Sequence, residues 1–185
     1  MENQQLHCGM IGNETSELCS PLKQLKSEHG PLRKQMEELY EYAGSIGIGK
    51  SRVTTEWKTQ LLELREKVIQ FTNHLEPHSE MEEGILFPLM ANYIGRDIGP
   101  IAVMEYEHDQ AKSNLNTFLD MTSTVKDNLT RLEAEKIAVF VSNAYLILSE
   151  HFMKEETVLF PLAEQTLSTE EKEELRERIE KSRRL

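Results

Sequence analysis

HSEMEEGILFPL, from His78 to Leu89, recurs as HFMKEETVLFPL, from His151 to Leu162. The two copies agree at the histidine, at two consecutive glutamates and at a closing Leu-Phe-Pro-Leu. A His-x-x-x-Glu pair turns about 400° along an α-helix, which leaves its side chains about 40° apart on one face. Each copy can therefore present one imidazole and one carboxylate to the same metal centre.

A Glu-His pair precedes each copy, as Glu28-His29 and as Glu107-His108. Apolar residues recur at steps of three and four around all four histidines, which is typical of helices that pack in a bundle. The four apolar stripes run over residues 18–43, 61–89, 101–125 and 137–162. The sequence predicts an all-α fold, an antiparallel up-down-up-down four-helix bundle with a short C-terminal surface helix.

Helix boundaries follow from local signals. Ser20 and Pro21 favour a helix start, and the glycines from Gly44 onward favour a stop, so the first helix is expected over Pro21–Ala43. Pro77 lies inside the second stripe and predicts a bend beside His78. The expected domain organisation is a flexible N-terminal tail over 1–19, the bundle over 20–167 and a charged C-terminal helix over 168–185. Ser168 and Glu171 form a candidate capping box for that last helix.

Six ionisable residues occupy seam positions where apolar residues are expected. At 1.5 Å per residue they fall in one layer of an up-down bundle. Burying them costs several kcal/mol unless cations compensate, so a metal centre is the natural explanation. Imidazole with carboxylate suits first-row divalent ions, which predicts two iron ions in a non-haem diiron centre, with Mn or Zn less favoured. The predicted ligands are His29, His78, Glu82, His108, His151 and Glu155.

Other polar residues near these positions leave alternatives open. His74 lies four residues before His78 but about 40° further from the seam centre, so it is either a metal ligand or an outer or surface residue. Glu28, Glu107 and Glu150 could orient imidazoles as hydrogen-bond acceptors, although their place beside histidines in the sequence points them elsewhere on the helix. Glu105 with His108 resembles a ferritin-type Glu-x-x-His pair, but the other histidines lack one.

Composition excludes several classes of function. The chain has 185 residues and a net charge of -11, which disfavours nucleic acid as a partner. The first residues lack the basic cluster and apolar region of a leader, and no apolar run is long enough to cross a membrane, so we expect a cytoplasmic protein. Cys8 and Cys19 match no usual zinc spacing and are expected to be reduced thiols rather than a redox or dimer-forming pair.

With its paired His-x-x-x-Glu-Glu-x-x-Leu-Phe-Pro motif, the chain resembles the hemerythrin-like, HHE cation-binding family over about Pro21 to Leu167. The resemblance implies an antiparallel four-helix bundle with a non-haem diiron centre, oxo- or hydroxo-bridged when oxidised, whose ligands map onto the six residues above. The symmetric motifs are most similar to bacterial proteins that repair iron centres after nitric oxide or peroxide stress.

The chain departs from these relatives in three ways. The repair proteins carry an extra ligand histidine where this chain has Thr54 or its neighbours, and a longer, cysteine-bearing N-terminal domain. Oxygen-carrying hemerythrins place two histidines on the third helix, whereas the spare one here, His74, is on the second. The last departure disfavours an oxygen carrier.

Three functions fit these observations. The first is binding of O2 or NO at an open metal position, in storage, sensing or defence against nitrosative or oxidative stress. The second is redox chemistry or iron donation that repairs damaged iron centres, with a redox partner. The third is an iron-sensing regulatory module. The residues do not decide whether there is enzymatic turnover, or what the oligomeric state is.

Overall fold

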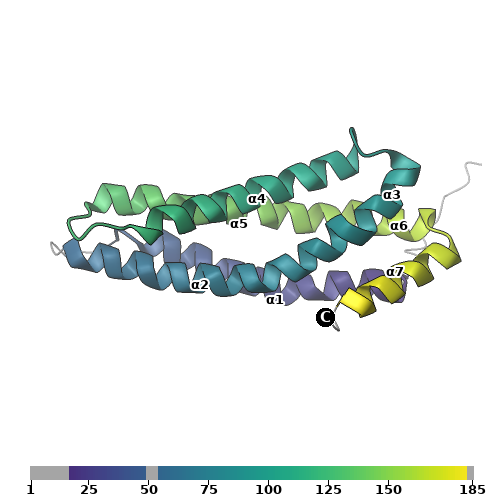
Figure 1. The fold of residues 1–185 in the computed structure, drawn as a ribbon, viewed down its shortest axis with the longest axis horizontal. Coiled ribbons are helices and arrows are strands. Elements are labelled where there is room, and N and C mark those ends of the chain that lie inside the picture. Colours follow the sequence, from purple (N-terminus) through teal and green to yellow (C-terminus); the bar gives the residue numbers. More distant parts are fainter. Residues whose placement is uncertain (1–16, 49–53, 183–185) are drawn as a thin grey trace, which may run out of the picture.

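The computed structural model describes residues 17–48 and 54–182, with the side chains of all of these except Thr54 and Thr55. Figure 1 shows long helical rods that run alternately along one axis. The elements are α1 Ser20–Ser45, α2 Thr54–Met81, η1 Glu82–Leu86, α3 Phe87–Ile94, α4 Pro100–Ser123, α5 Arg131–Lys154, η2 Glu155–Leu159, α6 Phe160–Thr166 and α7 Thr169–Ser182. The predicted up-down-up-down bundle with a C-terminal surface helix is confirmed.

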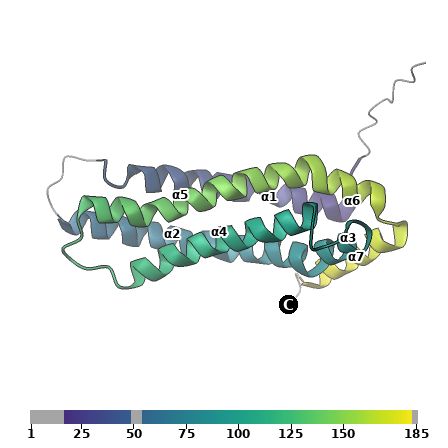
Figure 2. The same ribbon diagram turned by 90° about the horizontal axis from the view of Figure 1, so that it is seen from above.

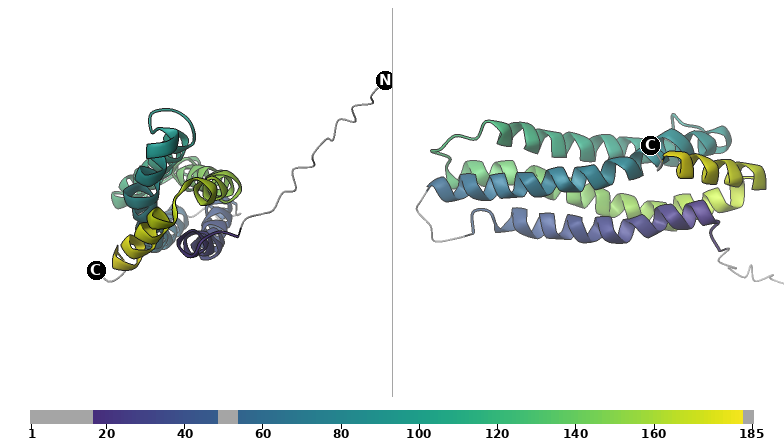
Figure 3. Two further views of the ribbon diagram at one scale, coloured as in Figure 1. Left: turned by 90° about the vertical axis from the view of Figure 1, so that its right-hand side faces the viewer. Right: turned by 60° about the horizontal axis from the view of Figure 1, so that its bottom comes forward.

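The rods form a closed ring of neighbours. α1 packs against α2, α2 against α4, α4 against α5, and α5 back against α1, as the end view of Figure 3 shows. The second rod continues from α2 through η1 into α3, and the fourth continues from α5 through η2 into α6. α1 and α4 therefore each lie between the second and fourth rods, and each of these two rods carries one copy of the repeated motif.

Two apolar clusters fill the bundle, one on each side of the histidine layer. The longer cluster holds Trp57, Phe71, Phe118 and Phe152 with the aliphatic residues around them. The shorter one holds Phe87, Phe160 and the residues of α3, α6 and α7. Because apolar burial drives folding, these clusters provide most of the stabilisation and hold the polar layer between them.

The helix ends follow ordinary capping rules. α1 begins with Pro21 in its first turn and ends near Gly47, which has φ of +88° and lies under the side chain of Glu135. Thr130 and Glu133 form a reciprocal capping box at the start of α5. The predicted capping box at Ser168 and Glu171 is also present, with N···O distances of 2.9 and 3.2 Å.

The irregularity in the second rod lies after Pro77. α2 runs through Pro77 without interruption, and the hydrogen bonding instead becomes π-helical from Glu82. In η1 the N–H of Phe87 donates to the carbonyl of Glu82, five residues back. The same bond joins Phe160 to Glu155 in η2. Both π-turns end beside the motif proline, which has no N–H to donate to the carbonyl four residues earlier.

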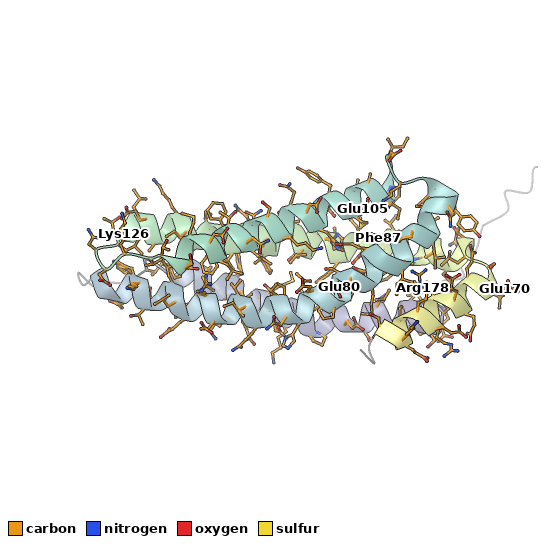
Figure 4. All side chains as sticks on the ribbon, in the orientation of Figure 1. Glu80, Phe87, Glu105, Lys126, Glu170 and Arg178 are labelled. Atoms are coloured by element: carbon orange, nitrogen blue, oxygen red, sulfur yellow. The ribbon has the colours of Figure 1, made fainter. Side chains whose placement is uncertain are left out.

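α7 folds back against the end of the bundle that contains α3 and α6, as seen from above in Figure 2. Its side chains Leu175 and Ile179 are fully buried against this end, while its acidic and basic residues form ion pairs on the outer surface. Arg178, labelled in Figure 4, donates to the backbone carbonyl of Gly84 in η1 at 2.9 Å. The charged helix predicted from the sequence is thus attached to one of the π-turns.

In the part of the chain that the structure describes, none of the helices combines the length and apolar character that a membrane crossing requires.

Candidate metal centre

All six predicted ligands lie together in the layer between the two apolar clusters. α1, α2, α4 and α5 each supply one histidine, and the two π-turns each supply one glutamate at their first residue. Every one of the six is at most 3% exposed. The seam positions in the sequence therefore converge as the helical spacing predicts.

The six side chains form two overlapping sets of four donors. The first donor set is His29, His78, Glu82 and Glu155, and the second is Glu82, His108, His151 and Glu155. Within each set the donor atoms lie within 4.8 Å of one another. Both glutamates belong to both sets, so each set has two imidazole nitrogens and two carboxylate oxygens.

Each shared carboxylate divides its oxygens between the two sets. Glu82 places Oε1 3.3 Å from Nε2 of His78 and Oε2 3.5 Å from Nε2 of His108. Glu155 places Oε2 3.4 Å from Nε2 of His29 and Oε1 3.3 Å from Nε2 of His151. This is the arrangement by which two carboxylates bridge a pair of metal ions.

Four further glutamates accept hydrogen bonds from the opposite nitrogen of each ring. Glu156 accepts from Nδ1–H of His29 at 2.8 Å, and Glu83 accepts from Nδ1–H of His108 at 2.6 Å. Because an ionised carboxylate only accepts, each such contact places the ring proton on Nδ1 and leaves Nε2 as a lone-pair donor. This is how proteins commonly orient a metal-binding histidine.

The other two contacts complete a ring around the bundle. Glu28 on α1 accepts from His78 on α2 at 2.9 Å, and Glu107 on α4 accepts from His151 on α5 at 3.2 Å. Together with Glu83 and Glu156, each rod orients the histidine of the next rod, in the order α1, α2, α4, α5 and back to α1. We call these four residues the carboxylate ring: Glu28, Glu83, Glu107 and Glu156.

Basic residues hold three members of the carboxylate ring in place. Arg33 donates to Glu156 at 2.6 Å, and Lys112 donates to Glu83 at 2.7 Å. Lys154 forms an ion pair with Glu107. The hydrogen bond from His108, followed by that from Lys112, lowers the pKa of Glu83 to about 2 despite partial burial. Despite partial burial, hydrogen bonds to a histidine and a basic residue also lower the pKa of Glu107 and Glu156, so these three carboxylates are kept ionised as acceptors at neutral pH.

The electrostatics of the layer fit a cation in each donor set. Among the described residues, none of the four oxygens of Glu82 and Glu155 is paired in a hydrogen bond. With the ring protons on Nδ1, the Nε2 atoms of His29 and His78, 3.2 Å apart, present lone pairs to each other. The same holds for His108 and His151 at 2.7 Å. Metal ions between these atoms would satisfy every one of these groups.

Protonation neutralises the layer only in part. Despite burial, hydrogen bonds to carboxylates raise the pKa of His151 to about 9. Burial, followed by the neighbouring His78, lowers the pKa of His29 to about 4, so this ring is neutral at physiological pH. Burial and the nearby charge of Glu82 raise the pKa of Glu155 to about 8. The two carboxylates therefore resist being ionised together unless cations lie between them.

Aromatic rings enclose the layer. Phe87 of the first motif, labelled in Figure 4, lies 5.6 Å from the His108 ring, and Phe160 of the second lies 5.6 Å from the His29 ring, between ring centroids. In a regular α-helix Phe87 would lie about 140° around from Glu82, but the π-turn brings the two closer to one face. Phe87 and Phe160 thus pack in the core next to the donors.

Not every residue singled out in the sequence reaches the centre. His74 is exposed on α2, where Nδ1 contacts Gln35 at 2.9 Å, and it lies outside both donor sets. Glu150 is 72% exposed and lies 3.8 Å from Lys154. Cys19 is half-buried, and its backbone N–H donates to Glu164 at 2.6 Å. Cys8 and the side chain of Thr54 lie outside what the structure describes.

Sequence reasoning missed the roles of Glu83 and Glu156. Their signal was present, because the motif repeats a second glutamate directly after the first. Glu28 and Glu107 do orient histidines, but those of the next rod rather than their own neighbours in the chain. The basic residues Arg33 and Lys112 lie four residues after His29 and His108, respectively. This equal spacing is a second repeat in the sequence.

Comparisons with known proteins agree with this geometry. The profile of the hemerythrin HHE cation binding domain matches residues 20–163. Curated relatives named iron-sulfur cluster repair protein YtfE are 32% identical over 145 residues in Musicola paradisiaca and 31% identical over 141 residues in Dickeya chrysanthemi. A third, from Escherichia coli (strain SMS-3-5 / SECEC), is 32% identical over 138 residues.

In each of these three comparisons the match covers 73% of this chain and 60% of the relative, so the chain spans about three fifths of their length. The matched family profile covers both motif copies, both Glu-His pairs and all four rods of the bundle. The chain therefore belongs to the hemerythrin HHE cation-binding domain family.

Proposed function

We propose that this chain binds two iron ions in the two donor sets and uses them in the repair of damaged iron centres. The observation that carries the metal site is the set of four buried carboxylate oxygens of Glu82 and Glu155, each directed at a histidine nitrogen and none hydrogen-bonded among the described residues. The names of the curated relatives support the repair function.

The residues of the chain prepare the donors before any metal arrives. The carboxylate ring keeps each Nδ1 protonated and aims each Nε2 at the layer. The rigid rods fix the spacing of the donors, and the surrounding aromatic rings exclude water, which strengthens electrostatic interactions within the layer. Iron ions bound there would supply redox-active centres with coordination positions that the protein does not fill.

The position of one histidine disfavours oxygen storage, and the open coordination positions suit iron donation. The spare histidine, His74, is exposed on α2, so the described residues do not add a fifth histidine to the centre. Each donor set supplies four protein atoms, which leaves more than one position of an octahedral iron to exchangeable ligands. An iron ion with few protein ligands is easier to transfer, which suits iron donation to a damaged cluster.

Binding of O2 or NO is a second candidate function, supported by the same open positions. The two functions are compatible, because a ligand and a transferred ion both need coordination sites that the protein leaves free. A reversible charge-transfer band that forms with oxygen and disappears under argon would favour a carrier. Steady turnover with a reductant would favour redox chemistry.

The deciding experiment measures metal content and repair activity on the same preparations. We expect about two iron ions per chain and a difference in absorption between oxidised and reduced protein. The loaded protein should reactivate an iron-sulfur enzyme previously inactivated with nitric oxide. Glu150→Gln, which changes an exposed carboxylate outside both donor sets, is the matched control and should reactivate the enzyme equally well.

Glu82→Ala should lose both the iron and the reactivation. Iron-loaded protein that gives no more reactivation than free ferrous ion would refute the repair function but leave the metal site intact. Purified protein that cannot be loaded with iron would refute both.

A further inference from the structure

Four apolar side chains form a regular exposed row on α5. Leu132, Val139, Leu146 and Met153 are 59%, 46%, 54% and 53% exposed. Successive members are seven residues apart, so the row drifts by only about 20° at each step and extends for about 31 Å. We call these four residues the α5 stripe. Figure 2 shows α5 flanked by α1 and α4. The exposure of its four members places the stripe on the face of α5 that these helices leave uncovered.

The bundle does not use the α5 stripe for its own packing. The opposite face of α5 supplies the core, through Ala134, Ile137, Ala138, Val141, Ala144, Leu148 and Phe152. Apolar side chains at every seventh position lie along one line of a helix, so a second helix aligned with that line can cover all four.

We propose that the α5 stripe binds a second copy of this chain, with the two α5 helices antiparallel about a two-fold axis between Val139 and Leu146. This axis places Leu132 against the partner's Met153, and Val139 against the partner's Leu146. Every exposed apolar residue of the stripe is then covered by another, as a self-complementary interface between identical chains requires.

Charges beside the stripe are complementary in the antiparallel arrangement. Lys136 and Glu150 lie on the same flank of the stripe, each within four residues of two of its members, and both are exposed. About the proposed axis, Lys136 faces the partner's Glu150, and the symmetric pair forms as well. A parallel pairing places the two copies of Lys136 on opposite flanks of the interface, so neither Lys136–Glu150 pair can form. Complementary charges of this kind set partner orientation in coiled coils.

The surroundings of these residues leave them free for such contacts. Glu150 is 72% exposed and lies 3.8 Å from Lys154, at the limit of an ion pair within its own helix. Asn143, midway between Lys136 and Glu150, is exposed and falls beside the axis. Next to Val139 the surface is hollowed between α1 and α5, with Ala43, Ile46 and Ala138 in its walls. This hollow can receive the partner's Leu146 as a knob in a hole.

Sedimentation velocity of the full chain across the micromolar range tests the interface. We expect a dimer that Leu146→Glu converts to a monomer. Leu62→Glu, which changes an apolar residue of α2 that is 39% exposed, is the matched control and should leave the dimer intact. Both variants change exposed positions, so circular dichroism should show unchanged helicity. A monomeric parent chain at every concentration would overturn the proposal, as would a dimer that survives Leu146→Glu.

Charge exchange tests the orientation. Lys136→Glu and Glu150→Lys should each weaken dimerisation by roughly tenfold, because each turns two attractive contacts into repulsive ones. The double variant should restore the parental affinity. A double variant that is as weak as the single variants would overturn the antiparallel pairing.

Cross-linking tests the register without depending on affinity. In a chain with Cys8 and Cys19 replaced by serine, Asn143→Cys should form a disulfide-linked dimer under mild oxidation. Lys136→Cys should not, because the antiparallel arrangement places its two copies about 20 Å apart. Efficient cross-linking through Lys136→Cys would contradict the antiparallel register and overturn the proposal.

Discussion

The two halves of the bundle, residues 20–94 and 100–166, carry the same donors but surround them differently. Each half supplies a Glu-His pair, a His-x-x-x-Glu-Glu motif and a π-turn. The variable positions inside the motif break this symmetry. Phe152 and Lys154 in the second half correspond to Ser79 and Met81 in the first. The comparison separates the residues that make the donor sets from those that make the two sets unequal.

Phe152 makes the largest difference between the halves. Its fully buried ring stacks on His29 at 4.2 Å between centroids and lies 5.8 Å from His78, so it forms a wall of the first donor set. The pseudo-symmetric position in the other half belongs to the much smaller Ser79, which is also buried. The second donor set therefore lacks an equivalent aromatic wall from this motif position, and we expect exchangeable ligands to enter there first.

α7 adds a second difference. Arg178 donates to the carbonyl of Gly84, the group that Pro88 cannot serve because proline has no N–H. The C-terminal helix thus stabilises η1, the π-turn that positions Glu82 and Glu83. Because α7 packs against α1 and η1, it stabilises the first half more than the second.

Of the substitutions that test this comparison, loss of a shared carboxylate should have the largest effect, because it changes the iron content of both donor sets. Glu155→Ala removes one donor oxygen from each set, so we expect iron content to fall from about two ions per chain towards none. His108→Ala removes a donor from the second set alone and should leave about one ion. Metal analysis by plasma mass spectrometry checks both. Equal and full iron content in both variants would remove these residues from the site.

Truncation of the aromatic wall should come next. Phe152→Ala removes a fully buried ring and should lower the free energy of unfolding by about 3–5 kcal/mol. Ser79→Ala, at the equivalent position, should change it by less than about 1 kcal/mol. Urea unfolding of the metal-free variants measures the difference. Similar losses for the two substitutions would mean that the halves are packed more equally than the ring contacts indicate.

Neutralising the carboxylate ring should have a smaller effect that is similar in both halves. Glu83→Gln and Glu156→Gln keep the shape of the side chain but weaken its acceptance from Nδ1–H. Iron affinity should fall by roughly 10–100-fold in each variant. Competition with a coloured chelator measures it, with Glu150→Gln as the control. A much larger loss in one variant would show that one donor set dominates binding.

Removal of the α7 contact should have the smallest effect. Arg178→Ala deletes one hydrogen bond, which contributes about 1 kcal/mol. Amide hydrogen exchange should become faster over residues 82–89 and stay unchanged over 155–162. The reason is that the hydrogen bond from Arg178 is made to the first of these two segments. Faster exchange in both segments would indicate that the whole end of the bundle depends on this contact.

The fold and the convergence of the six donors could be predicted because both follow from helical periodicity. Histidines and glutamates at core spacing, repeated twice, must meet when four such helices pack in alternating directions. Contacts between rods were harder to predict. Glu28 lies about 100° around the helix from His29, so its partner depends on which rod lies next to α1, and periodicity alone does not contain that order.

Helical periodicity did not predict the π-turns either, because it assumes a constant number of residues per turn. Pro77 predicted a bend beside His78; α2 continues through Pro77 to Met81, and the second rod changes direction in Figure 1 where α2 leads towards α3. The motif prolines Pro88 and Pro161 were the better signal, since they follow the donors at the same distance in both copies. In each copy the proline has no N–H to donate to the carbonyl four residues earlier. The wider π-turn accommodates this missing hydrogen bond.

The placement of Glu155 has a consequence for synthesis of the protein. Both donor sets include this residue, which lies in the last fifth of the chain, so a nascent polypeptide that ends before it contains neither set in full. Under the proposed iron binding, a single helical hairpin emerging from the ribosome would hold neither donor set in full. Iron loading would then follow synthesis of Glu155, and a product truncated before this residue would lack both complete sets.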